Sequence, residues 1–325
     1  MKKFNSGYIY ILLCTLIFSF VEVALKRTTG MFHPMQITVL RFLIGGAVLL
    51  PVAVRSIRRR GERLSGRDYA FFAAVGFLLV CVAMMIYQIA LTYTQASVVA
   101  VLFSSNPLFI TILAHLILRE DIHKNHIVAL VFEVIAIFVI VDPLHAALSP
   151  VGCAFAVASS IFFALYSVIG KGMTPRVGGL AVTSFAALFG GAELLLVLLF
   201  GRTAAGEALF TAANLPLFVD APLFRGLTAA SLPWLFYLGV INTPGGFGFH
   251  MLAMEKTNAQ TASIVYFLKP MLSPVLALIV LRERITPGMW LGILCFLVGS
   301  GFAILPGVIE GYKKSKESET KTAAD

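Results

Sequence analysis

The sequence predicts an all-α integral membrane protein, and three observations support this. Apolar residues make up 59% of the 325 residues and charged residues only 13%, and the mean hydropathy is +0.91. A soluble domain has roughly 45–50% apolar and about 25% charged residues. The apolar residues also form long continuous runs, which favours spanning helices over a transmembrane barrel. A soluble enzyme, a DNA-binding protein and a disordered chain are therefore disfavoured.

Ten apolar runs are bounded by charges, glycine or proline, and each predicts one transmembrane helix. In order they cover residues 8–25, 35–54, 69–91, 97–118, 127–143, 151–170, 178–200, 231–252, 259–281 and 288–306. The first run follows two lysines, as a signal peptide would. It lacks a clean small-residue cleavage site and carries Glu22 near its end, so we interpret it as a retained span.

The distribution of Lys and Arg predicts how the chain is oriented. With the N-terminus placed in the cytoplasm, seventeen basic residues fall on the inside and six on the outside, while Arg41 and Lys269 lie within runs. Because basic residues favour the cytoplasmic side, both termini are expected there, in a multi-pass protein of a bacterial-type inner membrane. The net charge of +9 lies at the edges of apolar runs and forms no single basic face, so no nucleic-acid partner is expected.

Two stretches lie outside the predicted spans. Residues 201–230 are expected on the outside, either as a loose insertion, which we favour, or as a short interfacial helix over the mouth of the protein. Residues 312–325 are polar and rich in Lys and Glu, which predicts a disordered cytoplasmic tail.

The chain contains an internal repeat. Residues 90–122 align without gaps with residues 253–285, and ten of the 33 positions are identical, including a mid-run proline and an L-R-E-x-I sequence. This pattern indicates a tandem duplication. Each half, 1–148 and 149–311, holds five predicted spans, and an odd number requires the halves to cross the membrane in opposite directions. Inverted repeats are typical of alternating-access transporters, which bind substrate near the midplane between the halves.

These features resemble the drug/metabolite transporter superfamily, specifically its EamA-type ten-helix members. The resemblance is carried by Leu40-Arg41-Phe42, the Asn106-Pro107 and Lys269-Pro270 pairs and the two L-R-E sequences, and it extends over roughly residues 8–306. It implies export or exchange of small metabolites, amino acids or drugs. The long 201–230 segment and several additional charges within the spans depart from the family pattern, so the resemblance implies no particular substrate.

Lys269 is the most informative candidate binding residue. It lies about ten residues into its run and directly precedes Pro270. A proline removes a backbone donor and frees the carbonyl one turn earlier, here that of Tyr266, and at the repeat-related Asn106-Pro107 that of Phe103. The lysine, the amide and the two carbonyls could bind a carboxylate or another anionic group. The alternative is a structural ion pair between Lys269 and a glutamate: Glu22, Glu133 or Glu193.

Other ionisable residues within the runs also require an explanation, because charges at the centre of a span are costly. Arg41 and Glu22 are expected at equal depth, where they form an ion pair unless Arg41 binds the substrate or acts in gating. Glu133, Glu22 and Glu193 are candidates for proton coupling, and for Glu133 pairing with Lys269 or His115 is the favoured alternative. Lys26 is expected to extend toward the membrane surface.

Aromatic and imidazole side chains could complete the site. Tyr87 and Tyr266 are preferred because buried hydroxyls need polar partners, and Phe103 and His250 are further candidates for the substrate-binding set. The four cysteines occur singly within apolar runs, without metal-ligand spacing. We identify no catalytic constellation, metal site or cofactor motif.

The sequence thus predicts a secondary active transporter, and not an enzyme, that moves a small polar metabolite of amino-acid or organic-acid type. Because no ATP-binding motif is present, a proton or counter-substrate gradient would supply the energy. The partners are the substrate and the lipid bilayer, and the protein is expected as a monomer or homodimer. Alternatives are drug or cation efflux by the same fold, a passive channel, and a membrane-embedded enzyme.

Overall fold

The computed structural model describes residues 6–122, 124–141, 149–213, 215–299 and 301–302. Within these residues, seven helical segments are long and apolar enough to cross a membrane. They are Ser6–Thr28, Pro34–Arg59, Gly66–Tyr93, Ala96–Leu118, Pro150–Val177, Gly179–Phe200 and Ala259–Leu281, and each overlaps one predicted run. Ile127–Ile140 and Pro287–Gly299 are shorter apolar helices at two further runs. The predicted disordered tail lies outside the described residues.

Several of these segments contain breaks or changes of helical type. In the first half the elements are α1 (Ser6–Phe18), α2 (Val21–Thr28), α3 (Pro34–Arg59), α4 (Gly66–Gly76), η1 (Phe77–Met84), α5 (Met85–Tyr93), α6 (Ala96–Phe103), α7 (Asn106–Leu113), η2 (Ala114–Leu118) and α8 (Lys124–Val141). The segments η1 and η2 are π-helical. Breaks therefore occur between α1 and α2 and between α6 and α7, in the middle of two apolar runs.

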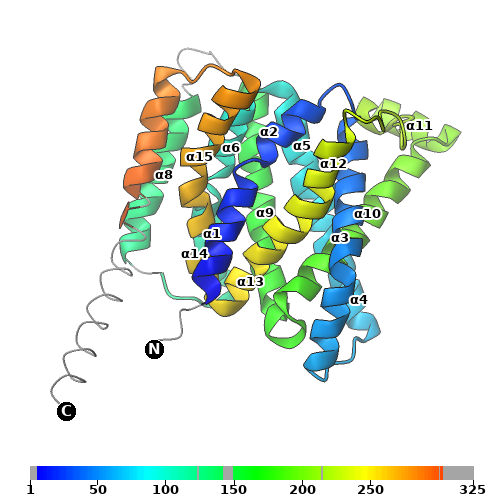
Figure 1. Cartoon of the computed structure of the whole chain (residues 1–325), viewed down its shortest axis with the longest axis horizontal. Coiled ribbons are helices and arrows are strands. Elements are labelled where there is room, and N and C mark those ends of the chain that lie inside the picture. Colours follow the sequence, from blue (N-terminus) through cyan, green and yellow to red (C-terminus); the bar gives the residue numbers. More distant parts are fainter. Residues whose placement is uncertain (1–5, 123, 142–148, 214, 300, 303–325) are drawn as a thin grey trace.

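The second half is also built of helices. Its elements are α9 (Pro150–Val177), α10 (Gly179–Phe200), α11 (Ala204–Ala212), η3 (Pro216–Phe218), α12 (Leu232–Phe236), η4 (Tyr237–Phe247), α13 (Gly248–Lys256), α14 (Ala259–Ala262) and α15 (Ile264–Leu281). The predicted run 231–252 forms α12, the π-helical η4 and α13 in direct succession. Figure 1 shows the helices side by side in one bundle, with α3, α4 and α10 on one flank and α8 on the other.

Small residues allow helices to pack closely on the flank of the bundle formed by α4 and α10. A Cβ atom built on Gly190 would lie 2.1 Å from the carbonyl oxygen of Gly76. Nearby, Ser184 Oγ donates a hydrogen bond to the carbonyl oxygen of Gly46, at 2.8 Å. Such small-residue contacts are typical of helices associating in a membrane, where lipid leaves little hydrophobic force to drive them together.

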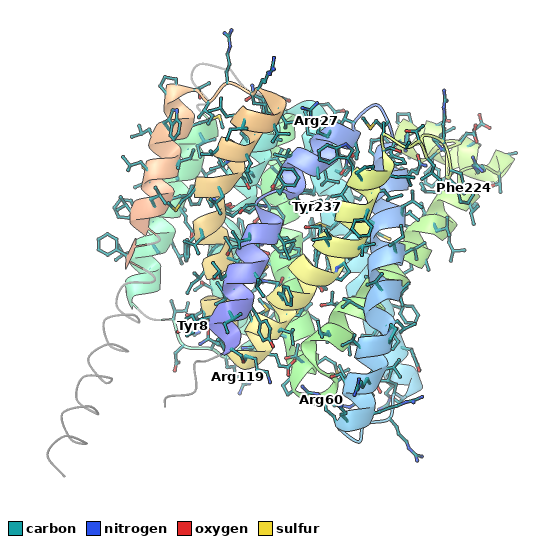
Figure 2. All side chains as sticks on the ribbon, in the orientation of Figure 1. Tyr8, Arg27, Arg60, Arg119, Phe224 and Tyr237 are labelled. Carbon is teal, nitrogen blue, oxygen red and sulfur yellow. The ribbon has the colours of Figure 1, made fainter. Side chains whose placement is uncertain are left out.

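The bundle has two ends. Figure 2 shows Arg27 and Phe224 at one end, hereafter the first end, and Arg60 and Arg119 at the other, the second end. The two L-R-E sequences also lie at opposite ends, because Arg27 donates a hydrogen bond to the carbonyl of Val280, close to the second L-R-E, at 2.5 Å. Arg119 and Arg282 end their helices in the same left-handed conformation, each with φ 57°.

The segment 201–230 is ordered by its own helices, so the favoured expectation of a loose insertion is wrong. It contains α11 and η3, which pack together through Phe210 and Phe218, whose ring centres are 5.2 Å apart. Gln36 of α3 anchors the remainder by donating to the carbonyls of Leu223 and Arg225, at 3.0 and 2.8 Å. Composition alone did not reveal this docking, because a single glutamine side chain provides both hydrogen bonds.

Candidate substrate-binding site

The central polar contact is an ion pair between Lys269 of α15 and Glu22 of α2. Both residues are about 1% exposed. Glu22 lies in the first turn of α2, where free backbone N–H groups and the helix dipole favour a negative charge. Of the alternatives for Lys269, the structure therefore contains the ion pair, with Glu22 as its partner.

Two further side chains hold the carboxylate of Glu22. The hydroxyl of Tyr87 donates a hydrogen bond to one oxygen, and Ser273 Oγ lies 3.5 Å from the other. The ammonium group of Lys269 also lies 5.0 Å from the ring centre of Phe103 and 6.0 Å from that of Tyr87. Cation–π contacts of this kind add stabilisation to a desolvated ammonium. Glu22 thus has both an ion pair and a hydrogen bond from neighbouring side chains.

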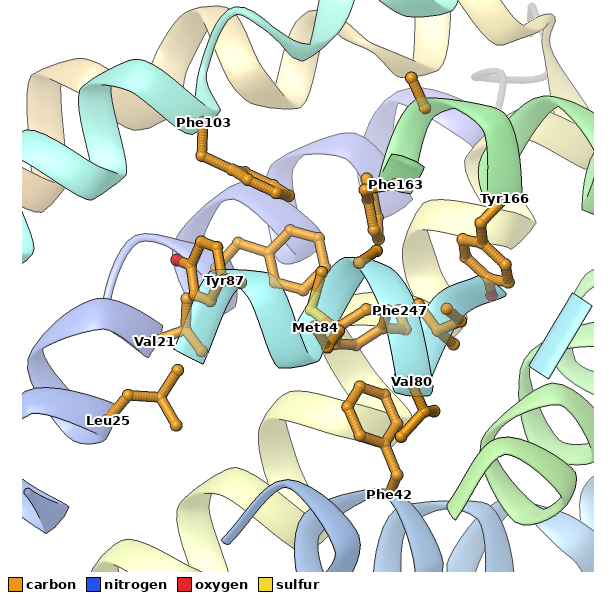
Figure 3. Packing of buried hydrophobic residues seen from close by; sticks show 14 of the residues in the cluster. Val21, Leu25, Phe42, Val80, Met84, Tyr87, Phe103, Phe163, Tyr166 and Phe247 are labelled. Atoms are coloured by element: carbon orange, nitrogen blue, oxygen red, sulfur yellow. The ribbon is translucent and has the colours of Figure 1, made fainter. Parts of the chain in front are cut away.

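A cavity lies beside this ion pair in the apolar interior. It is lined by Phe18, Val21, Arg41, Met84, Tyr87, Phe103, Phe163, Phe247 and Lys269. Figure 3 shows how Val21, Met84, Tyr87, Phe103, Phe163 and Phe247 come together from several helices. The cavity measures about 20 Å³, which is enough for about one water molecule. A larger ligand therefore requires the surrounding helices to move apart.

The breaks and π-helical segments position the lining. Phe18 ends α1 and Val21 begins α2, on either side of the Ser19–Phe20 interruption. Phe103 ends α6, while Met84 and Phe247 end the π-helical segments η1 and η4. π-Helical turns shift the register of the side chains that follow and occur frequently at functional sites. The cavity therefore lies where the helices depart from regular geometry.

Arg41 lines the cavity and forms no ion pair with Glu22, so that expectation was wrong. Its side chain is 0% exposed, and among the described residues neither Nε nor one terminal nitrogen has a hydrogen-bond partner. Its guanidinium carbon lies 4.8 Å from the ring centre of Phe42. Because burying an unpaired cation is costly, this arginine is the least compensated charge in the site.

Three predicted site residues lie near the cavity but do not line it. Asn106 donates to the carbonyl of Ser160 at 2.8 Å, and Ser160 Oγ donates to the carbonyl of Phe103 at 3.2 Å. The carbonyl freed by Pro107 is therefore already occupied. Tyr266 and His250 form a second layer, with ring centres 6.0 and 5.6 Å from that of Phe163. The hydroxyl of Tyr266 and Nδ1 of His250 lack hydrogen-bond partners.

The other carboxylates within spans lie apart from the ion pair. Glu133 of α8 is 0% exposed and neither of its oxygens has a hydrogen-bond partner of ordinary geometry, although the backbone of Leu108 faces it. It pairs with neither Lys269 nor His115, whose Nδ1 instead lies 2.9 Å from the carbonyl of Glu120. Glu193 of α10 is partly exposed, and one of its oxygens is buried without a partner.

Each L-R-E glutamate binds the N-terminus of a helix in the opposite half of the chain. Glu283 accepts hydrogen bonds from the backbone N–H groups of Ala96 and Ser97, at 2.9 and 3.0 Å, where α6 begins. Glu120 accepts one from the N–H of Ala259, at 3.3 Å, where α14 begins. Sequence analysis missed these contacts, although Ala96 and Ala259 are themselves a repeat-related pair.

A lysine lies beside each of the two L-R-E glutamates. Lys171 forms an ion pair with Glu120. Lys26 donates to the carbonyls of Leu91 and Thr94, at 2.7 and 2.8 Å, with the charge of Glu283 nearby. Lys26 is therefore held by backbone carbonyls of the protein.

Five residues of the apolar lining lie outside the predicted substrate-binding set. Val21, Met84 and Phe163 resemble dozens of other apolar residues in the runs, and no spacing distinguishes them. Phe18 and Phe247 carry a weak signal, because they are aromatic residues beside a helix break and the glycines at 245–246 respectively. Arg41, in contrast, was a predicted site residue, because an arginine within an apolar run is costly.

The fold and the site define a multi-pass helical protein with a charged cavity in its interior, and comparison with known proteins identifies its family. The model of the EamA-like transporter family matches residues 5–142 and, a second time, residues 150–305. The chain belongs to the EamA-like transporter family.

Two relatives are also named as transporters. An uncharacterized transporter of Clostridium kluyveri is 33% identical over 309 residues, covering 92% of each chain. An uncharacterized transporter of Archaeoglobus fulgidus is 24% identical over 305 residues, covering 94% of this chain and 97% of the relative. One solved structure superposes with a TM-score of 0.66 at 19% identity, covering 92% of this chain and 96% of that one, which shows a shared fold.

Proposed function

We propose that the protein is a secondary active transporter with ten transmembrane helices in two inverted five-helix repeats, residues 1–148 and 149–311. It moves a small polar metabolite of amino-acid or organic-acid type across a bacterial-type inner membrane, by export or exchange. Access to the binding site alternates between the two sides of the membrane.

The observation that carries this proposal is the cavity, because it combines depth, charge and apolar surroundings. Arg41 and Lys269 are fully buried there, and their helices come from different halves of the chain. Charged groups in the interior of a membrane protein are rare and mark ion or substrate pathways. A site between two repeats is also where inverted-repeat transporters bind substrate.

The inverted arrangement rests on the repeat and on the positions of its ends. The two L-R-E sequences lie at opposite ends of the bundle, and each binds the N-terminus of a helix from the other half. The match of one family model to each half is consistent with a duplication. We place both termini in the cytoplasm from the Lys and Arg bias, which makes the second end cytoplasmic.

Glu133 is the best of the three candidates for proton coupling. Glu22 is engaged by Lys269 and Tyr87, and Glu193 is partly exposed. Glu133 is fully buried with both oxygens free of ordinary hydrogen bonds. A carboxylate that must be neutral in one state and charged in another requires a site with few fixed partners, and Glu133 has such a site.

A transport assay separates this proposal from the membrane-enzyme alternative. The purified chain is first screened by thermal shift against metabolites, because a ligand that binds the folded state raises its unfolding temperature. The radiolabelled ligand is then offered to sealed proteoliposomes and to protein-free liposomes. We expect saturable accumulation of chemically unchanged ligand in the proteoliposomes only. Ligand converted to a product, or internal counts equal to those of empty liposomes, would contradict transport.

A further inference from the structure

We infer that the substrate is an organic monocarboxylate with an apolar, ring-bearing body, and that Arg41 binds its carboxylate. This inference rests on the proposed function and narrows its substrate class. It follows from the charge balance of the cavity and from the chemistry of the remaining lining.

The charge balance leaves one positive charge without a partner. Lys269 and Glu22 neutralise each other in direct contact, and Tyr87 donates a further hydrogen bond to the carboxylate. Arg41 lies in the same cavity with Nε and a terminal nitrogen unbound. A ligand with one negative charge would make the site neutral, whereas a cation would add to the imbalance.

The geometry of the arginine selects the kind of anion. A guanidinium group offers parallel N–H donors in a plane, which match the two oxygens of a carboxylate. The unbound Nε and terminal nitrogen are the two donors of such a fork. An amino acid adds an ammonium group to its carboxylate, and this zwitterion would leave the net charge of the site unchanged.

The remaining lining selects the body of the ligand. Apart from Arg41, Tyr87 and Lys269, the lining side chains are apolar: Phe18, Val21, Met84, Phe103, Phe163 and Phe247. Four of these are phenylalanines, and aromatic rings favour edge-to-face or offset contacts with other rings. Several already meet edge to face, such as Phe18 and Phe247, whose ring centres are 5.1 Å apart. A sugar or a polyol would find no hydrogen-bond partners on these surfaces.

A binding panel tests this inference on the purified full-length chain in detergent. The probes are benzoate, phenylacetate and 3-phenylpropionate, each compared with its uncharged amide and its amine counterpart. We expect at least one carboxylate to raise the unfolding temperature, with binding about tenfold or more tighter than its amide. Equal effects of a carboxylate and its amide, preference for the amines, or no effect of any probe would overturn the inference.

Arg41 variants identify the binding group. In Arg41→Gln we expect the preference for carboxylate over amide to disappear, and in Arg41→Lys we expect weaker binding with the preference retained. Arg225→Gln, which removes an exposed arginine at the first end, is the matched control and should bind as the wild type does. An unchanged preference in Arg41→Gln would overturn the role of Arg41. The panel measures binding alone, so it can succeed or fail independently of the transport assay.

An independent observation, the pair of L-R-E contacts, carries a second inference. We propose that they are two latches that close the cavity toward opposite ends of the bundle. The first-end latch comprises Glu283, the start of α6 and Lys26, and the second-end latch comprises Glu120, the start of α14 and Lys171. Each joins the two halves of the chain, and both are formed in this structure.

The latches are suited to opening because their bonds can be exchanged for water. Both glutamates are partly exposed, unlike the fully buried Glu22, so water can reach either one when its contact opens. α6 and α15 contain cavity-lining residues, so movement at the first-end latch changes the cavity directly. Alternating access requires that one contact open while the other holds.

A cysteine within the cavity reports on both latches. Met84→Cys is introduced with the four native cysteines replaced by alanine, and an impermeant thiol reagent is applied from one side of sealed membranes. We expect Glu283→Gln to increase labelling only from the first-end side, and Glu120→Gln only from the second-end side, each several-fold. Asp220→Asn and Glu62→Gln remove surface carboxylates from other ion pairs and should leave labelling unchanged. Equal labelling from both sides in either variant, or no increase, would overturn the proposal.

Discussion

The ion pair between Glu22 and Lys269 shows how single residues set the character of the site. A buried charge is tolerated when its partner, hydrogen bonds and local dipoles compensate it together. Glu22 has all three, through Lys269, Tyr87 and the first turn of α2. Lys269 has Glu22 as its ion-pair partner, whereas Arg41 has the ring of Phe42 and no ion pair among the described residues. This difference between the two cations of the cavity distinguishes a structural charge from a binding one.

Removing one member of the pair should destabilise the protein, because it leaves the other charge buried and alone. We expect Lys269→Met to cost about 3–5 kcal/mol, seen as a lower unfolding midpoint in detergent. Combining Lys269→Met with Glu22→Gln should recover part of this loss. Arg202→Ala, which breaks the exposed pair with Asp220, should cost less than about 1 kcal/mol. A double variant no more stable than Lys269→Met would argue against the pair.

Glu133 is expected to affect proton coupling and not substrate binding. Glu133→Gln mimics the protonated acid, so we expect it to abolish gradient-driven accumulation while substrate exchange between the two sides persists. Both quantities are measured in proteoliposomes with and without an imposed pH gradient. Normal accumulation in the variant would remove Glu133 from the mechanism, and loss of ligand binding would assign it a structural role.

The sequence identified the charged residues within the apolar runs but not which of them form ion pairs. A charge within an apolar run is visible in the sequence, so Lys269, Arg41, Glu22 and Glu133 were all identified. Which cation meets which anion depends on how helices distant in the chain rotate and approach, and the spacing of residues carries no information on that. The sequence therefore left Glu22 as a possible partner of either Arg41 or Lys269, and the structure pairs it with Lys269.

At the scale of helices, irregular segments build the site. The interruptions after Phe18 and Phe103, and the π-helical segments η1 and η4, turn side chains into the cavity. Hydropathy predicts the runs that contain these features but not the features themselves, because a helix and its π-helical turn bury similar apolar residues. Pro107 does mark the start of α7, as its missing N–H allows, whereas Pro270 lies within the continuous α15.

The close approach of α4 and α10 is expected to depend on Gly190, which has no side chain. Gly190→Ala places a Cβ atom against the backbone of Gly76, so the helices must separate. We expect a loss of about 1–3 kcal/mol, measured as a lower unfolding midpoint. Gly66→Ala is the matched control, because nothing lies within 4 Å of the Cβ it would add. Equal stability of the two variants would contradict this packing.

The whole molecule is organised by its two ends, and the charge bias predicts which is cytoplasmic. In a background without native cysteines, single cysteines in the 55–67 loop should be shielded from an impermeant thiol reagent in intact cells. A cysteine in the 203–213 stretch, which contains α11, should react. The same reagent should label the 55–67 loop after the cells are opened. Labelling of that loop in intact cells would reverse the orientation.

The central claim is that one cavity is exposed to the two sides in turn, and trans-stimulation tests it most directly. The initial rate of uptake of labelled ligand is compared between proteoliposomes loaded with unlabelled ligand and proteoliposomes that contain no ligand. A carrier returns faster when occupied, or at least exchanges its ligand one for one, so the account predicts faster uptake into the preloaded vesicles. Uptake that is equal in both, and that increases linearly with concentration without saturation, would indicate a passive channel and contradict the account.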